Sequence, residues 1–169
     1  MDTSEKIVET YLRFCLKACT ISNLKCSGNK EIDLLAIDKH GKRYHVEVSI
    51  KTRDEFAVLR GGDYRVVRDK ARRQRHLTYF KDRKFNDPTI KRKLKDYGFT
   101  RNNYQKVIVS NGWENGIDRI ARRYKIELWH IKDILQKLIH LMENERLFIQ
   151  DDILRLFQLL HRTGIRIQL

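Results

Sequence analysis

The sequence has few cysteines and no long apolar runs, which argues against a zinc-binding protein and against a membrane protein. The three cysteines, Cys15, Cys19 and Cys26, form no CxxC pair, so buried thiols are favoured over a zinc site, which needs a fourth ligand. No run approaches the ~20 apolar residues that span a bilayer, and the N-terminus lacks the apolar stretch of a signal peptide. We therefore expect a cytoplasmic protein with no membrane partner.

Proline and glycine are also scarce. One proline and eight glycines in 169 residues, with 41% hydrophobic and 34% charged residues, are typical of a folded chain and not of a disordered one. There is no P-loop, no Rossmann glycine fingerprint and no GxSxG element, so nucleotide hydrolysis, nicotinamide chemistry and serine catalysis have no support.

Positive charge is the most prominent feature that is present. The chain has 36 Lys and Arg against 22 Asp and Glu, a net charge of +14, which favours a polyanionic partner. Residues 60–101 hold fifteen of the basic residues and five Asp. We expect contacts with the nucleic-acid backbone from Arg72, Arg73, Arg75, Lys91, Arg92, Lys93 and Lys95. Aromatic residues between them suit stacking on unpaired bases: Tyr79, Phe80, Phe85, Tyr97 and Phe99. The alternative is a solvated basic helix whose aromatics pack inward.

The hydrophobic periodicity predicts an α/β protein. Helices are expected over 3–19, 64–80, after 88, and over 115–125, 132–142 and 150–161. Strands are expected over 20–26 (a weak signal), 31–38, 43–51, 104–110 and 126–131, with a possible terminal strand at 165–169. This order, α-β-β-β-α-β-α-β-α, implies a mixed central sheet flanked by helices. We expect a core over 1–143, with a basic insertion at about 60–101, and a C-terminal helical extension over 144–169 packed on the same domain.

Polar residues interrupt the two strands of the predicted hairpin. Successive strand residues face opposite sides, so Glu47, Ser49 and Lys51 share one face of the second strand. Asp33 lies near the start of the preceding strand, where its carboxylate can approach that of Glu47 at one edge of the sheet. Two carboxylates repel each other unless a cation lies between them, and oxygen ligands favour Mg²⁺ or Mn²⁺.

Gly28, "EID" (31–33) and "VEVSIK" (46–51), after a helix that bears glutamates, resemble the motif of the PD-(D/E)XK nuclease superfamily. The resemblance covers about residues 5–142 and implies a restriction-endonuclease-like fold. It also implies that Asp33 and Glu47 bind the metal, with the Val48 carbonyl as a further ligand.

The sequence departs from this motif at the lysine position, where it has Ser49. Lys51, two residues further on the same face, is our candidate for a migrated lysine. Related nucleases supply a glutamate from the first helix, and between Glu5 and Glu9 we choose Glu9. Gln74 and Tyr79 resemble the QxxxY element of RecB-like nucleases, but they are one residue further apart, so this pair has little weight.

The resemblance implies a Mg²⁺- or Mn²⁺-dependent DNA endonuclease, which could act as a homodimer through the last two helices. Two alternatives stay open. The site could have decayed, which would leave a nucleic-acid-binding module that does not cut. The chain could also be an interaction subunit whose basic face docks an acidic partner.

Overall fold

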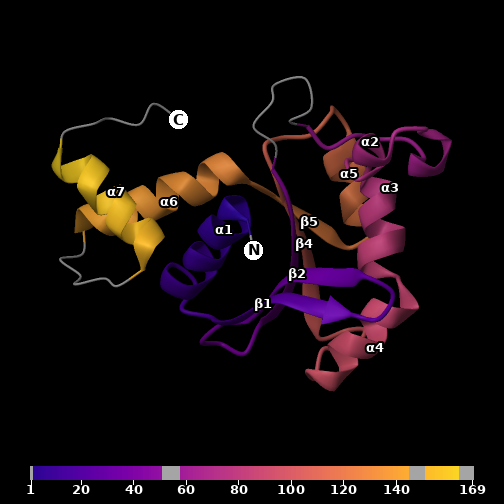
Figure 1. Cartoon of the computed structure of the whole chain (residues 1–169), viewed down its shortest axis with the longest axis horizontal. Coiled ribbons are helices and arrows are strands. Elements are labelled where there is room, and N and C mark those ends of the chain that lie inside the picture. The colour runs from indigo at the N-terminus through magenta and orange to yellow at the C-terminus, as the bar shows by residue number, and fades with distance from the viewer. Residues whose placement is uncertain (1, 51–57, 145–150, 164–169) are drawn as a thin grey trace.

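The computed structural model describes residues 2–50, 58–144 and 151–163 (Figure 1). The strands are β1 (Cys19–Cys26), β2 (Lys30–Ile37), β3 (Arg43–Ser49), β4 (Tyr104–Ser110) and β5 (Ile126–His130). The longer helices are α1 (Thr3–Phe14), α4 (Pro88–Asp96), α5 (Ile117–Arg123), α6 (Ile131–Asn144) and α7 (Asp152–Arg162). Short helical turns lie between β3 and α4: η2 (Tyr64–Val66), α2 (Lys70–Arg73), α3 (Leu77–Tyr79) and the π-helical segment η3 (Phe80–Phe85).

The strands form one five-stranded sheet in the order β1-β2-β3-β4-β5. β1, β2 and β3 pair antiparallel, whereas β3, β4 and β5 pair parallel. The helical connections before β4 and β5 make the parallel pairs possible. The prediction of a mixed α/β sheet flanked by helices is therefore confirmed, and the strand expected from a weak signal at 20–26 is β1.

Helices cover both faces of the sheet (Figure 1). One face is covered by α1 and α6, with α7 packed on these two helices, and its core includes Leu12, Val46 and Leu138. The other face packs on α3, η3, α4 and α5, through residues such as Phe85 and Ile108. Alternation along β3 puts Val46 on the first face and Glu47 on the second. The polar residues of the predicted site therefore lie on the face covered by the basic segment.

The first helix is shorter than predicted. Asp2 caps its N-terminus: its side chain accepts from the Glu5 N–H, and the Glu5 carboxylate accepts from the Asp2 N–H. The helix ends at Phe14, and Lys17 takes a left-handed conformation (φ 53°). Cys19 is consequently the first residue of β1, so the prediction that the first helix extends to residue 19 is wrong.

The prediction of a single basic helix over 64–80 is also wrong. After η2 and α2, a backbone bridge from Arg60 to His76 interrupts the helix, and helical structure resumes only at Leu77. The predicted short helix after residue 88 is confirmed as α4. Asp87 caps α4 and Pro88 is its first residue, where the missing proline N–H has no cost.

The C-terminal helix α7 packs on α1 and α6, the helices that cover the first face of the sheet. Leu154 and Phe157 enter the core formed with α1 and α6, and Asp151 accepts a hydrogen bond from the Thr10 hydroxyl at 3.3 Å. Leu156 and Leu159 are 51% and 61% exposed. The possible strand at 165–169 lies outside the described residues. Among the helices of the described ranges, none has an apolar stretch long enough to cross a bilayer.

Candidate active site

Asp33 and Glu47 meet where β2 and β3 separate. The two strands pair as far as Leu34 and Val46, and beyond that point the Val48 N–H donates to Asp33 Oδ2 at 2.8 Å. A side-chain oxygen thus replaces the backbone acceptor of the neighbouring strand. Asp33 is 8% exposed and Glu47 is fully buried. The predicted convergence of these two carboxylates is present in the structure.

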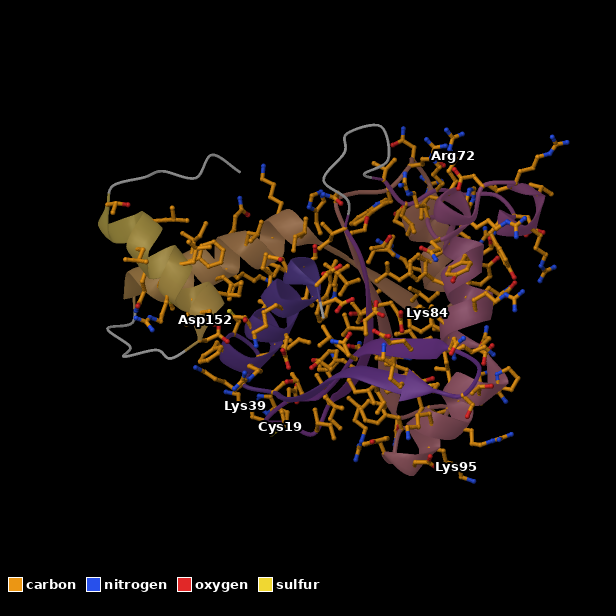
Figure 2. The ribbon with its side chains drawn as sticks, viewed as in Figure 1. Cys19, Lys39, Arg72, Lys84, Lys95 and Asp152 are labelled. Atoms are coloured by element: carbon orange, nitrogen blue, oxygen red, sulfur yellow. The ribbon has the colours of Figure 1, made fainter. Side chains whose placement is uncertain are left out.

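The cation between them comes from a part of the chain that the sequence did not indicate. The Lys84 ammonium of η3 lies 3.0 Å from Asp33 Oδ1 and 2.5 Å from Glu47 Oε2, and it donates to the Glu31 carbonyl at 3.0 Å. Figure 2 shows Lys84 near β2, on the side of the sheet that η3 and α4 cover. One lysine therefore neutralises part of the charge of both acids.

His45 holds the other oxygen of Glu47. Its Nε2 lies 2.7 Å from Glu47 Oε1, and its ring packs edge-on against Phe85 with 4.9 Å between ring centroids. Complete burial, together with the charge of Lys84, lowers the pKa of His45 to about 3. The imidazole is therefore neutral and Nε2–H donates to the carboxylate. His45 positions Glu47 by this hydrogen bond.

Burial dominates the electrostatics of the two acids. It raises the pKa of Asp33 to about 7, and the charge of Glu47 adds to the rise while Lys84 opposes it. Burial also raises the pKa of Glu47, against the lowering effect of Lys84. The pKa of Lys84 is raised because the two carboxylates outweigh its own burial. Acids with such pKa values are typical of functional sites.

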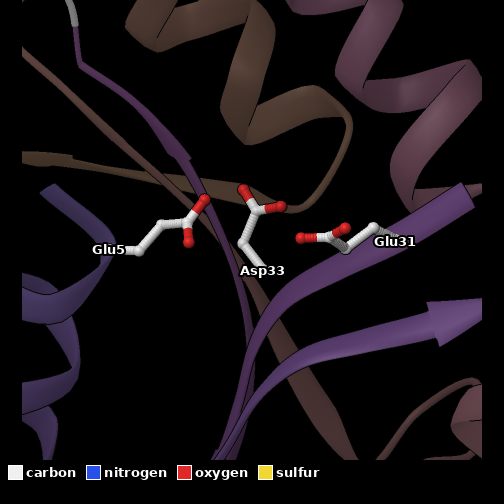
Figure 3. Close-up of side chains that lie close together, drawn as sticks. All are labelled: Glu5, Glu31 and Asp33. Atoms are coloured by element: carbon white, nitrogen blue, oxygen red, sulfur yellow. The ribbon is translucent and has the colours of Figure 1, made fainter. Parts of the chain in front are cut away.

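A second group of acids extends the site. Ligand atoms of Glu5, Glu31 and Asp33 lie within 4.8 Å of one another, and Figure 3 shows the three carboxylates in a row between α1 and β2. The Asn23 side-chain amide faces two of them, 3.2 Å from Glu5 and 2.8 Å from Glu31. Lys25 forms an ion pair with Glu31. Burial raises the pKa of Glu5, and Asp33 contributes to the rise.

These residues fit a divalent cation. Glu47 Oε2 is buried and, within the described residues, receives no aligned hydrogen bond, although it contacts Lys84 as an ion pair. Within the described residues, the lysines that form ion pairs with this group of four carboxylates are Lys84, with Asp33 and Glu47, and Lys25, with Glu31; Glu5 has no such pair. An all-oxygen donor set with excess negative charge suits Mg²⁺ or Mn²⁺. Asp33 is common to both groups of acids and would be the shared ligand.

The remaining predicted site residues have different outcomes. Glu9 is not part of the site: it accepts from the Thr20 hydroxyl at 3.0 Å and pairs with Lys6 at 3.4 Å. Glu5, one turn earlier on α1, reaches Asp33 in its place. The Val48 N–H binds Asp33, while its carbonyl as a metal ligand stays a prediction. Ser49 ends β3 in register with Ser110.

Lys51, the predicted migrated lysine, lies outside the described residues. Its role stays a prediction, but Lys84 already provides an ammonium at the two carboxylates. Lys84 is 51 residues from Asp33 in the chain and belongs to a run of many basic residues. No local spacing distinguished it from its neighbours.

The predicted nucleic-acid contacts lie on both sides of the site along the basic segment, as Figure 2 shows for Arg72 and Lys95. Arg72, Lys91, Arg92 and Lys95 are exposed, while Arg73 and Lys93 are half-buried. Arg75 is 9% exposed, so its prediction as a surface contact is wrong. Most of the predicted stacking residues are also buried, namely Phe80, Phe85 and Phe99, because they form the core beneath the basic segment.

Gln74 and Tyr79 nevertheless line one pocket of about 480 Å³. The same pocket is lined by Arg73 and Arg83 and borders the acids through Glu31 and Lys84. The helix is broken between Arg73 and Leu77, so helical spacing does not decide whether the two side chains meet. This pocket opens beside the acid site.

In the metal-free protein, we expect the stability of the Asp33→Asn variant relative to the parent to increase as the pH rises from about 4 to about 7. With a raised pKa, Asp33 contributes stability that is complete below its unfolded value of about 3.9 and is lost as the pH rises through about 7. His45 has the opposite effect, because its pKa is lowered: its contribution to stability is complete above pH 6.5 and is lost as the pH falls toward about 3. Both proteins contain His45, so this effect cancels in the comparison.

Urea unfolding at a series of pH values tests this expectation. The difference in the free energy of unfolding between the two proteins should shift toward the variant by up to about 1.4 kcal/mol per pH unit. A difference that stays constant with pH would show that Asp33 has an ordinary pKa.

Comparisons with known proteins show only the fold. No protein family and no curated protein matches the chain. A crystal structure of a protein of unknown function, AF1548, is similar with a TM-score of 0.50 and 20% identity, over 95% of this chain and 77% of the other. At that identity the likeness supports the mixed α/β architecture and carries no information on activity.

Proposed function

We propose that this protein is a metal-dependent nuclease of the PD-(D/E)XK type that hydrolyses phosphodiester bonds in DNA. One observation carries the proposal: carboxylates from two adjacent strands, Asp33 and Glu47, converge with the ammonium of Lys84 where the strands separate. Burying three charged groups together is unfavourable unless they are paired or used. Such an arrangement is typical of a site selected for chemistry.

The chain's own residues have separate tasks in this proposal. Asp33 and Glu47 would hold Mg²⁺ or Mn²⁺, with Glu5 and Glu31 as further acidic groups. When bound, the metal polarises the phosphodiester and lowers the pKa of an attacking water. His45 orients Glu47 through its Nε2–H. Lys84 replaces the lysine that the motif has at position 49, and it offsets negative charge that develops on the phosphate.

The surroundings of the site favour a nucleic-acid substrate. Exposed basic residues lie on α2 and α4, on both sides of the segment that contains Lys84. Phosphate contacts from such residues give affinity that does not depend on sequence. Such contacts can form with duplex, single-stranded or branched DNA and with RNA.

A silent binding module is the second candidate, and one observation favours it. Lys84 already pairs with both carboxylates, and Ser49 stands at the motif's lysine position. If the lysine neutralises the two carboxylates, the site is stable without a metal ion. On this reading the basic surface binds nucleic acid and nothing is cut.

Cleavage of labelled duplex, single-stranded and four-way-junction DNA distinguishes the two candidates. With Mg²⁺ or Mn²⁺ the parent is expected to cut, and Glu47→Gln should lower the single-turnover rate by about 10²–10³-fold, in the range found for removal of one transition-state contact. Glu9→Gln is the matched control, because Glu9 is also a buried acid but bonds Thr20 outside the site. It should cut at nearly the parent rate.

DNA binding is measured alongside, without metal. If the parent binds all substrates but cuts none of them with either metal, the protein is a binding module. Weak and salt-independent binding would instead favour an interaction subunit.

A further inference from the structure

A second pocket, of about 650 Å³, lies between α4 and the start of β4 and gathers positive charge. Its cationic lining residues are Lys91, Lys95, Arg101, Lys106 and Lys125. None of the described residues that line it is acidic. Within the described part of the chain, none of these five side chains forms an ion pair. They come from α4, the loop after it, β4 and the residue before β5, so the tertiary fold assembles this cluster.

The electrostatics of this cluster favour an anion, most clearly at Lys106. Lys106 is half-buried, with its ammonium 6.0 Å from the centre of the Phe85 ring. Burial lowers the pKa of Lys106, and the positive charges of Lys91, Arg101 and Lys125 lower it further. Like charges that surround a hollow repel one another, and an anion in the hollow would reverse the sign of that interaction.

We propose that this pocket binds phosphate groups. Lysine and arginine side chains are the usual partners of phosphate oxygens. The lining also contains neutral donors in the Asn86 and Asn102 amides and the Thr100 hydroxyl. The combination matches an anion with several acceptor oxygens better than it matches a carboxylate.

The pocket is joined to the acid site through η3. Lys84 reaches the two carboxylates, Phe85 packs on His45, and Asn86 lines the pocket. A strand of nucleic acid that crosses the acid site could therefore place a neighbouring phosphate here. The inference that the phosphate belongs to a nucleic acid rests on the proposed function. The inference that the pocket binds phosphate does not.

The test measures binding without metal, so that no cleavage occurs. Fluorescence anisotropy of a labelled oligonucleotide is followed as a function of salt for the parent, Lys106→Met and the double variant Lys91→Gln/Lys95→Gln. Lys39→Gln/Lys132→Gln is the control of equal charge, since both lysines are exposed and lie on the β2–β3 turn and on α6. Thermal unfolding with and without tripolyphosphate or ATP is the second readout.

The salt slope of log K should become shallower by about 1 for Lys106→Met and by about 2 for the double variant, and change little in the control. Lys106→Met should unfold at the same or a higher temperature than the parent, because a repelling charge is removed while the apolar stem is kept. Tripolyphosphate should raise the unfolding temperature of the parent more than that of Lys106→Met.

Three outcomes separate the possibilities. A stabilisation by tripolyphosphate or ATP that needs Lys106, with unchanged DNA binding, supports the phosphate site and assigns it to a free polyphosphate compound and not to nucleic acid. Equal losses in the pocket variants and in the control overturn the proposal, because net charge alone would explain them. Pocket variants that lose DNA affinity while the parent never cuts support the site and contradict the nuclease.

Discussion

Replacing Lys84 by methionine is expected to lower the free energy of unfolding by about 3–5 kcal/mol at pH 8, the range for breaking a buried ion pair by removing one partner. Lys84 lies within 3.0 Å of both Asp33 and Glu47. Without it two buried carboxylates face each other, and both already have raised pKa values because of burial. At pH 5 the carboxyls can take up protons, so the loss should be smaller.

Denaturant unfolding at the two pH values measures this effect in the metal-free protein. Lys81→Met is the matched control, because Lys81 belongs to the same segment but its ammonium lies over Tyr124, 4.5 Å from the ring centroid, away from the acids. The double variant Glu47→Gln/Lys84→Met should recover part of the lost stability, since one of the facing charges is gone. A small loss that does not vary with pH would mean that Lys84 does not neutralise the acids.

Lys84 rather than Lys51 is expected to support cleavage. In single-turnover reactions Lys84→Met should be slower by about 10²–10³-fold, whereas Lys51→Met should stay within about tenfold of the parent. We expect this difference because the Lys84 ammonium contacts both predicted metal ligands, Asp33 and Glu47. DNA binding by each variant shows whether affinity or chemistry has changed.

Because Lys84→Met is also destabilised, each reaction is run at a temperature where circular dichroism shows the variant folded. Lys84→Arg supplies a second measurement, since it keeps the charge and should keep most of the stability. If the arginine variant regains part of the rate, positive charge is the property required. A large loss in Lys51→Met together with a normal rate in the Lys84 variants would assign the role to Lys51.

The sequence predicted the acids of the site because a strand is a local structure with a two-residue period. Alternation alone predicts that Glu47 lies on the opposite face of the strand from Val46. The turn after β2 predicts a hairpin, which brings Asp33 close to Glu47. The choice between Glu5 and Glu9 failed because both lie on one face of a helix. Which of them reaches Asp33 depends on how α1 crosses the sheet, and no local pattern encodes that crossing.

Lys84 was missed for a related reason. Its contact with Asp33 spans 51 positions in the chain and depends on where the helical segments after β3 begin and end. The basic pattern over 64–80 predicts one helix, but charge periodicity does not reveal a backbone bridge such as that from Arg60 to His76. Arg75 shows the same limit, since a basic residue in a basic run is not necessarily on the surface.

The edge strand β1 has a consequence for aggregation. β1 is an edge strand, and its register with β2 passes from Ser22 to Leu24 around Asn23, which has a left-handed φ of 51°. Regular exposed edges are templates for adding a strand from another molecule, and local irregularities and lysines disfavour this. Asn23 and Lys25 thus make β1 a poor template for intermolecular sheet growth, so the irregularity that brings an amide to the acids also helps keep the sheet from extending into a neighbour.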